Sequence, residues 1–147
     1  MKKLIIHIGT GKTGISSIRR SALDSALNLS KHNIFYLGKF FEYSPDPTAK
    51  ISDCFREGAH HLRDQWRTSI EKAFHQSLDD VFSGLPDDSV GFVLNESLHH
   101  LHSPFASSLK QFEERSQIQI KIKAYVRNHG DYSVSAYKQW GLKHKTN

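Results

Sequence analysis

Apolar residues recur along this chain in two patterns, one typical of strands and one typical of amphipathic helices. Short apolar runs at 4–8, 34–37 and 90–94 are bounded by glycine or polar residues, as expected for strands buried on both faces of a parallel sheet. A fourth run, 118–126, alternates apolar residues with Gln and Lys. This alternation predicts a strand with one wetter face, or one near the edge of the sheet.

Between these runs the apolar residues recur at helical spacing. We predict a first helix from Gly14 into the twenties, with Arg19, Arg20 and Asp24 facing solvent. Its buried stripe would be Ile15, Ile18, Ala22, Leu23, Ala26 and Leu27. A second helix is predicted from Asp64 to a stop at Gly84 and Pro86. Its buried face would be Trp66, Ile70, Phe74, Leu78 and Val81, with Ala73 and Phe82 beside it. A third begins at Ser103 and Pro104, with Phe105, Leu109 and Phe112 buried, and a last helix is capped by Asp131.

Strands that alternate with helices predict an α/β fold, with a parallel sheet of about four strands and helices on both faces. Residues 1–147 are long enough for one domain with a substantial core. In such three-layer folds ligands bind outside the carboxyl ends of the strands. Lys12, Glu96 and Arg127 each follow a predicted strand end, so we expect these three side chains at one edge of the sheet.

The turn after the first strand has the composition of a phosphate cradle. Gly9, Gly11 and Gly14 allow backbone N–H groups to crowd together, because no Cβ stands in the way. The helix that begins near Gly14 adds free N–H groups and the positive end of its dipole. Lys12 supplies a mobile cation over the same concavity. The stretch therefore predicts an anion site.

Two common nucleotide-binding patterns fit this turn in part. Gly11-Lys12-Thr13 matches the end of the P-loop pattern, but Ile6 stands where its first glycine belongs. The three glycines match the dinucleotide pattern, which requires an acidic residue about 20 positions further on. Gly38 and Lys39 follow the second strand instead. Neither pattern is complete.

The stretch from His7 to Ser17 resembles the 5′-phosphosulfate loop of sulfotransferases, which transfer a sulfuryl group from 3′-phosphoadenosine 5′-phosphosulfate (PAPS). Gly11 stands where the family usually has proline, and Ile15 replaces a hydroxyl residue and so removes one phosphate ligand. The resemblance implies a P-loop-like fold in which Lys12 binds the phosphate and assists the leaving group. It implies that the 5′-phosphate is held by Gly11, Lys12, Thr13, Gly14, Ser16 and Ser17.

A second stretch, 124–138, resembles the 3′-phosphate motif of the same family. In that motif an arginine ends a strand, and a serine eight residues later lies one turn into the next helix. Arg127 and Ser135 have this spacing. The resemblance implies that they bind the 3′-phosphate, a group for which the planar guanidinium is well suited.

Glu96 follows the third strand and is the candidate general base, because the family places a glutamate or histidine near this edge to accept the acceptor's hydroxyl proton. A base needs a pKa raised by burial. A carboxylate that pairs with Lys12 or caps a turn is the alternative, and His99 or His100 could serve instead. With His102 these histidines also suggest zinc, but they lack a supporting ligand pattern, and an exposed turn is the better interpretation.

The net charge of +5 and the pI near 9.4 favour anionic partners. A basic cluster comprising Lys121, Lys123, Lys138, Lys143 and Lys145 lacks a nucleic-acid motif, so a solvated face is expected there. The single cysteine, Cys54, excludes an internal disulfide framework and is compatible with a cytoplasmic location. No apolar run approaches the roughly 18 residues of a membrane span.

Together these features predict the amino-terminal part of a sulfotransferase-like domain that uses PAPS, with a hydroxyl on a carbohydrate, lipid or small molecule as acceptor and no metal. The family's domains are longer, so an incomplete or inactive member is also expected. Two other classes stay open. A P-loop-type kinase or nucleotide hydrolase would use Glu96 to bind magnesium. A non-catalytic interaction domain would retain only the decayed enzyme fold.

Overall fold

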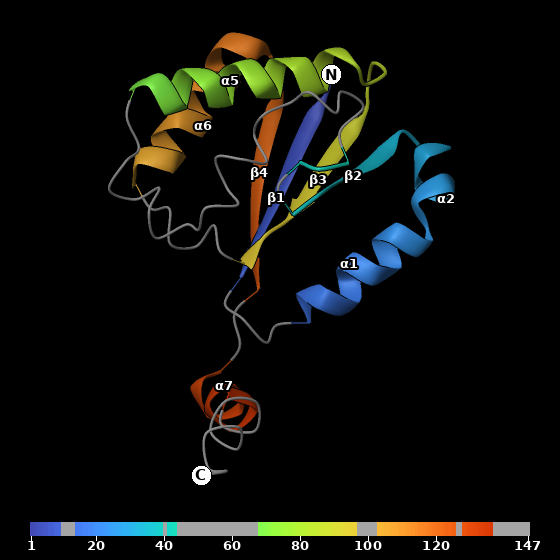
Figure 1. Ribbon diagram of the computed structural model, residues 1–147, viewed down its shortest axis with the longest axis vertical. Helices are drawn as coiled ribbons and strands as arrows, with labels where there is room; N and C mark the ends of the chain where they lie inside the picture. Colours follow the sequence, from blue (N-terminus) through green and yellow to red (C-terminus); the bar gives the residue numbers. More distant parts are fainter. Residues whose placement is uncertain (10–13, 40, 44–67, 97–102, 126–127, 137–147) are drawn as a thin grey trace.

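The computed structural model describes residues 1–9, 14–39, 41–43, 68–96, 103–125 and 128–136. Four parallel strands form one sheet in the order β2-β3-β1-β4 (Figure 1). The strands are β1 (Lys3–Gly9), β2 (Ile34–Gly38), β3 (Val90–Leu94) and β4 (Gln119–Tyr125). The helices are α1 (Ile15–Asp24), α2 (Ala26–Ser30), α5 (Thr68–Ser83), α6 (Ser103–Ser116) and α7 (His129–Ala136). The predicted α/β class and the four-stranded parallel sheet are confirmed.

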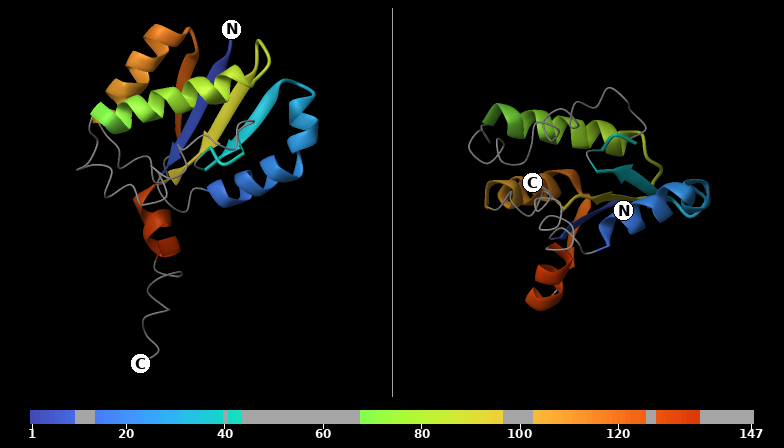
Figure 2. Two further views of the ribbon diagram at one scale, coloured as in Figure 1. Left: turned by 45° about the horizontal axis from the view of Figure 1, so that its top comes forward. Right: turned by 60° about the horizontal axis from the view of Figure 1, so that its bottom comes forward.

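The strand order explains why helices cover both faces of the sheet. From β1 the chain passes over β3 to reach β2, which moves it toward one edge of the sheet. The next two connections, from β2 to β3 and from β3 to β4, both move it toward the other edge. Because crossovers between parallel strands are right-handed, opposite directions place the helices on opposite faces. Accordingly α5 and α6 lie on one face and α1 on the other (Figures 1 and 2).

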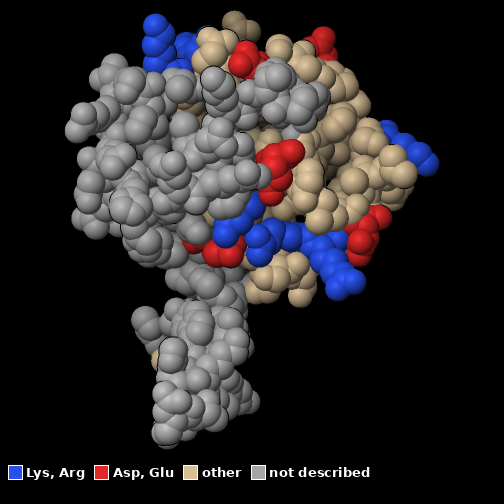
Figure 3. All heavy atoms as spheres, viewed as in Figure 1, with Lys and Arg blue, Asp and Glu red and all other residues tan. Residues whose placement is uncertain are grey.

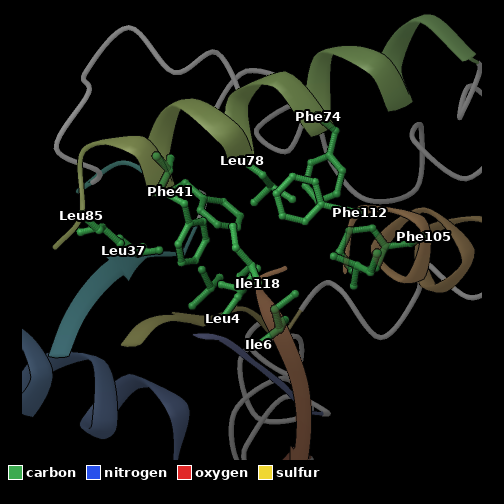
Figure 4. Close-up of a cluster of buried hydrophobic side chains, with 14 residues drawn as sticks. Leu4, Ile6, Leu37, Phe41, Phe74, Leu78, Leu85, Phe105, Phe112 and Ile118 are labelled. Carbon is green, nitrogen blue, oxygen red and sulfur yellow. The ribbon is translucent and has the colours of Figure 1, made fainter. Parts of the chain in front are cut away.

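The larger core lies between the sheet and α5 and α6 (Figure 4). Leu4 and Ile6 of β1 point into it, as expected for alternate residues of a strand. Helix α5 contributes Phe74, Leu78, Val81 and Phe82, which recur at helical spacing, and α6 contributes Phe105, Leu109 and Phe112. These buried stripes are the ones that the sequence predicts for the described parts of the two helices.

The smaller core lies under α1 and joins it to β2 and β3. Ile15 and Ala22 of α1 pack with Tyr36 and Leu94, and Phe92 borders them. The predicted stripe of the first helix is therefore wrong in part. Of its other members, Ile18 and Leu23 are exposed, and Leu27 is 84% exposed. The helix also ends earlier than expected, because Ser25 leaves helical geometry at φ −101°, ψ 6° and separates α1 from α2.

Strand β4 is the edge of the sheet, in agreement with its alternating sequence. All its residues from Lys121 to Tyr125 are exposed. Helix α7 follows and extends away from the sheet (Figures 1 and 2). Its cap differs from the prediction: the Asn128 side chain accepts a hydrogen bond from the Asp131 backbone N–H at 2.9 Å, so Asp131 lies in the first turn. Within the described part of the chain, no helix is long and apolar enough to cross a membrane.

Candidate functional site

The strand order predicts a ligand-binding site at the carboxyl ends of β1 and β3. These strands are neighbours, yet the chain leaves β1 toward α1 on one face and β3 toward α6 on the other. In open parallel sheets ligands bind where neighbouring connections diverge in this way. The glycine-rich turn follows β1, and Asn95 and Glu96 follow β3. A hydrogen bond of 3.0 Å from the Asn95 N–H to the His7 carbonyl joins the two strand ends.

The amino-terminal end of α1 has the geometry expected of the last part of an anion cradle. Gly14 is its N-cap and adopts φ +83°, a left-handed conformation that glycine reaches without strain. A Cβ placed there would have no atom within 4 Å, so the space above the helix start is open. No side chain of the described residues caps this end. The N–H groups of Ser17 and Ile18 bond to the Gly14 carbonyl, whereas the N–H groups of Ile15 and Ser16 in the first turn have no acceptor among the described residues.

The predicted phosphate ligands around Gly14 differ in their surroundings. Ser16 and Ser17 are exposed, so both hydroxyls are accessible to a ligand. Ile15, which stands where the motif has a hydroxyl residue, is 5% exposed and packs in the core under α1. Its side chain therefore anchors the helix to the sheet. Gly11, Lys12 and Thr13 lie outside the described residues.

The second predicted motif leaves the sheet beside the first. Strands β1 and β4 are paired in parallel, and Gly9 is the register partner of Tyr125. The strands that precede the two motifs, β1 and β4, therefore end side by side at the same level of the sheet. Arg127 lies outside the described residues. Ser135 belongs to α7, whose first residue is His129, and so lies nearly two turns into the helix, later than the motif implies.

Glu96 lies in a cluster of charged side chains contributed by three elements. Its Oε1 is 3.4 Å from the Lys39 Nζ and 3.8 Å from the Arg19 Nη2. All three side chains are half-buried, with 24–29% of each exposed. Figure 3 shows acidic and basic side chains close together on this side of the molecule. Glu96 therefore lies beside two cations, Lys39 and Arg19, whereas its predicted pairing with Lys12 involves a residue outside the described part of the chain.

The surroundings of Glu96 keep its carboxyl ionised. Partial burial raises its pKa, but a backbone hydrogen bond and the charges of Lys39 and Arg19 outweigh this effect and hold the pKa below its ordinary value of 4.5. This is opposite to the raised pKa expected of a general base. Nearby, burial and then the Glu42 carboxylate raise the pKa of Tyr36 to about 12, so this phenol stays protonated.

Two members of this cluster, Arg19 and Lys39, were not predicted as site residues from the sequence, and neither was Asn95 beside them. Arg19, expected to face solvent, also contacts Ser16, with 3.4 Å between its Nη2 and the Ser16 Oγ. Lys39 is positioned by Asn95, a 1% exposed residue whose side-chain amide donates to the Lys39 carbonyl at 3.0 Å. Their places in the sequence are a signal that could have indicated both: Asn95 directly follows the predicted third strand, and Lys39 comes two residues after the predicted second strand.

His7 is a further buried polar group below this edge. It is 6% exposed, and among the described residues neither of its ring nitrogens has a hydrogen-bond partner. Its ring lies 4.6 Å from the Tyr125 ring, measured between centroids. Burial lowers the pKa of His7 below 6.5, so the imidazole is neutral at pH 7. The candidate histidines 99, 100 and 102 lie outside the described residues. The described residues contain no group of three or more His, Cys, Asp or Glu side chains that could hold a metal ion.

Comparisons of this chain with protein-family models, with curated proteins and with solved structures find no match.

Proposed function

We propose that this chain is a sulfotransferase-like protein with a P-loop-like fold that binds PAPS at the carboxyl ends of β1 and β4. One observation carries the proposal. The two stretches that resemble the 5′- and 3′-phosphate motifs are more than 100 residues apart, yet they begin from neighbouring parallel strands at the paired residues Gly9 and Tyr125. One nucleotide with phosphates at both positions would be within reach of both segments.

The residues of the site fit the chemistry of sulfuryl transfer. The first-turn N–H groups of α1, the Ser16 and Ser17 hydroxyls and Lys12 would hold the 5′-phosphosulfate, and Arg127 with Ser135 the 3′-phosphate. The acceptor oxygen forms a bond to sulfur, and the bond between sulfur and the bridging oxygen breaks. The electron pair of the broken bond stays on the bridging oxygen of the phosphate, where Lys12 stabilises the developing negative charge. The acceptor's hydroxyl proton passes to Glu96.

Calorimetry with two nucleotides tests this proposal. The full chain should bind 3′-phosphoadenosine 5′-phosphate about 10- to 100-fold more tightly than adenosine 5′-phosphate, because the second nucleotide loses a charge-assisted phosphate contact. Arg127→Met should abolish the preference. Lys72→Met is the matched control, because Lys72 is an exposed residue of α5, on the face of the sheet opposite α1. This variant should retain the preference for 3′-phosphoadenosine 5′-phosphate.

The other outcomes separate the competing classes. Equal affinity for the two nucleotides contradicts the roles of Arg127 and Ser135. Preferential binding of a nucleoside triphosphate with magnesium assigns the chain to the kinase or hydrolase class. If the folded chain binds neither nucleotide, the interaction-domain alternative replaces the enzyme.

A further inference from the structure

Arg19, Lys39 and Glu96 bring one negative and two positive charges together at the end of β3. Lys39 follows β2, Arg19 comes from α1, and Glu96 follows β3. The three side chains thus join three separate elements. Tyr36 of β2 also faces this cluster and is neutral, and Glu42 accepts a hydrogen bond from the Lys39 backbone N–H at 3.0 Å.

The contacts inside this cluster are loose compared with another ion pair of the same molecule. Arg115 Nη2 and Asp79 Oδ2 are 2.7 Å apart, the usual length of a charge-assisted hydrogen bond. Arg19 and Lys39 approach Glu96 only to 3.8 and 3.4 Å. Each cation therefore stabilises the Glu96 carboxylate by its charge, without a short hydrogen bond between the two side chains. A small rotation of the arginine or lysine side chain would bring its cationic group to another anion instead.

Arg19 also connects this cluster to the predicted phosphate loop. It lies one turn after Ser16 in α1, and its Nη2 is within 3.4 Å of the Ser16 Oγ. An anion bound beside Ser16 is therefore within reach of the same guanidinium that faces Glu96. We propose that Arg19 and Lys39 form a subsite for the sulfuryl end of the donor, in which the Glu96 carboxylate is the resident anion until the donor arrives.

This subsite takes its ligand class from the proposed function, and it explains how Glu96 can act as a base. While Arg19 and Lys39 face the carboxylate, Glu96 is a weak proton acceptor. A sulfuryl group that attracts the two cations removes their stabilising charge from Glu96, and the carboxylate becomes more basic. The acceptor's proton can then pass to Glu96 only when the donor is in place.

Inorganic sulfate is the first probe, because it tests the subsite without the nucleotide. We expect the pKa of Glu96, followed by carbon-13 NMR of its carboxyl group in the full chain, to rise by about 1 in sulfate relative to chloride at equal ionic strength. Arg19→Met with Lys39→Met should remove this response. Arg20→Met with Lys31→Met, which changes exposed residues outside the cluster, is the matched control and should retain it.

Nucleotide affinities provide the second measurement. Arg19→Met and Lys39→Met should each weaken PAPS binding about tenfold and leave binding of 3′-phosphoadenosine 5′-phosphate within twofold, since that nucleotide has no sulfuryl group. If a methionine variant does not fold, Arg19→Lys, which keeps the cation, should retain the sulfate response. A Glu96 pKa that is the same in sulfate and chloride overturns the subsite. So does a response that persists in the double methionine variant.

The two proposals fail in different ways. If the chain binds neither nucleotide but sulfate still raises the pKa of Glu96 through Arg19 and Lys39, the cosubstrate is wrong and the anion subsite stands. If 3′-phosphoadenosine 5′-phosphate binds with the expected preference and sulfate leaves Glu96 unchanged, the proposed function stands and the subsite is wrong.

Discussion

The buried imidazole of His7 occupies a position where an apolar ring would make the folded state more stable. A buried donor or acceptor without a partner loses its hydrogen bonds to water and gains none in return. Neither ring nitrogen of His7 has a hydrogen-bond partner within the described part of the chain, and the ring contacts Tyr125. The depressed pKa adds a pH dependence. The unfolded chain takes up a proton near pH 6.5, before the folded chain does, so protonation favours unfolding as the pH falls below that value.

We therefore predict that His7→Phe stabilises the fold by on the order of 1–2 kcal/mol at pH 7. It should also flatten the loss of stability between pH 7 and pH 5, which urea unfolding at several pH values would measure. His32→Phe, at an exposed position before β2, is the control and should change neither quantity appreciably. A destabilised His7→Phe protein would mean that the imidazole has a structural partner in solution.

At the level of single residues, candidate site residues could be predicted from the sequence because they follow strands. Which of their side chains contact each other could not be predicted. Glu96 follows β3 as expected, but its contact with Arg19 depends on how α1 lies across the sheet. Helical periodicity assigned Arg19 to the solvent-facing side. A long arginine side chain can reach past the boundary of its face, because its aliphatic stem packs while its charged end makes polar contacts.

Helix α1 is attached to the sheet by few side chains, and Ile15 is the most informative of them. This helix buries only Ile15 and Ala22, whereas the larger core contains fourteen buried residues. The family resemblance suggests that threonine at position 15 would add a phosphate ligand. The structure indicates a different result, because a hydroxyl at this position would be buried between α1 and the sheet.

Ile15→Thr should therefore destabilise the protein by about 2 kcal/mol, since it removes buried apolar volume and buries a hydroxyl. Ile15→Val, which keeps the position apolar, should cost only about 1 kcal/mol. Chemical unfolding of the two variants measures the difference. An Ile15→Thr protein as stable as Ile15→Val, with tighter binding of 3′-phosphoadenosine 5′-phosphate, would show instead that this position faces the ligand.

Elements were predicted well where one strong pattern sufficed. Strand β3 has the predicted bounds, and the described parts of α5 and α6 bury the expected apolar stripes. The first helix was predicted to continue past Ser25 because apolar residues recur there, but the backbone leaves helical geometry at Ser25, and Ala26 and Leu27 beyond it are exposed. The cap of α7 was assigned to Asp131 because Asp is a good N-cap residue, but Asn128, three residues earlier, is one too, and only the backbone geometry distinguishes them.

At the scale of the whole molecule, strand order is the feature that the sequence left open. Alternating strands and helices require parallel pairing, but they do not determine which strand lies beside which, since pairing joins segments far apart in the chain. The observed order places β1 between β3 and β4. This order places β3, which precedes Glu96, on one side of β1, and β4, which precedes the second phosphate motif, on the other.

The same order leaves β4 as an edge strand with an uncovered carboxyl-terminal half. Ile120 and Ile122 share one face of this strand, yet Ile120 is partly buried against the larger core and Ile122 is 48% exposed. The two residues are a matched pair for testing whether this half of β4 is bare in solution. Replacing an isoleucine that is already in contact with water by a polar residue changes the stability of the protein little. Replacing one that packs against a core removes buried apolar contacts and lowers the stability.

We predict that Ile120→Thr lowers the free energy of unfolding by about 1–2 kcal/mol, and that Ile122→Thr changes it by less than about 0.5 kcal/mol. Urea unfolding at two protein concentrations, together with sedimentation analysis, would measure both effects. Equal costs at the two positions would mean that Ile122 is covered in solution. If the cost at Ile122 also grew with protein concentration, a second copy would be the covering surface, because only association makes stability depend on concentration. A cost independent of concentration would place the cover within the chain itself.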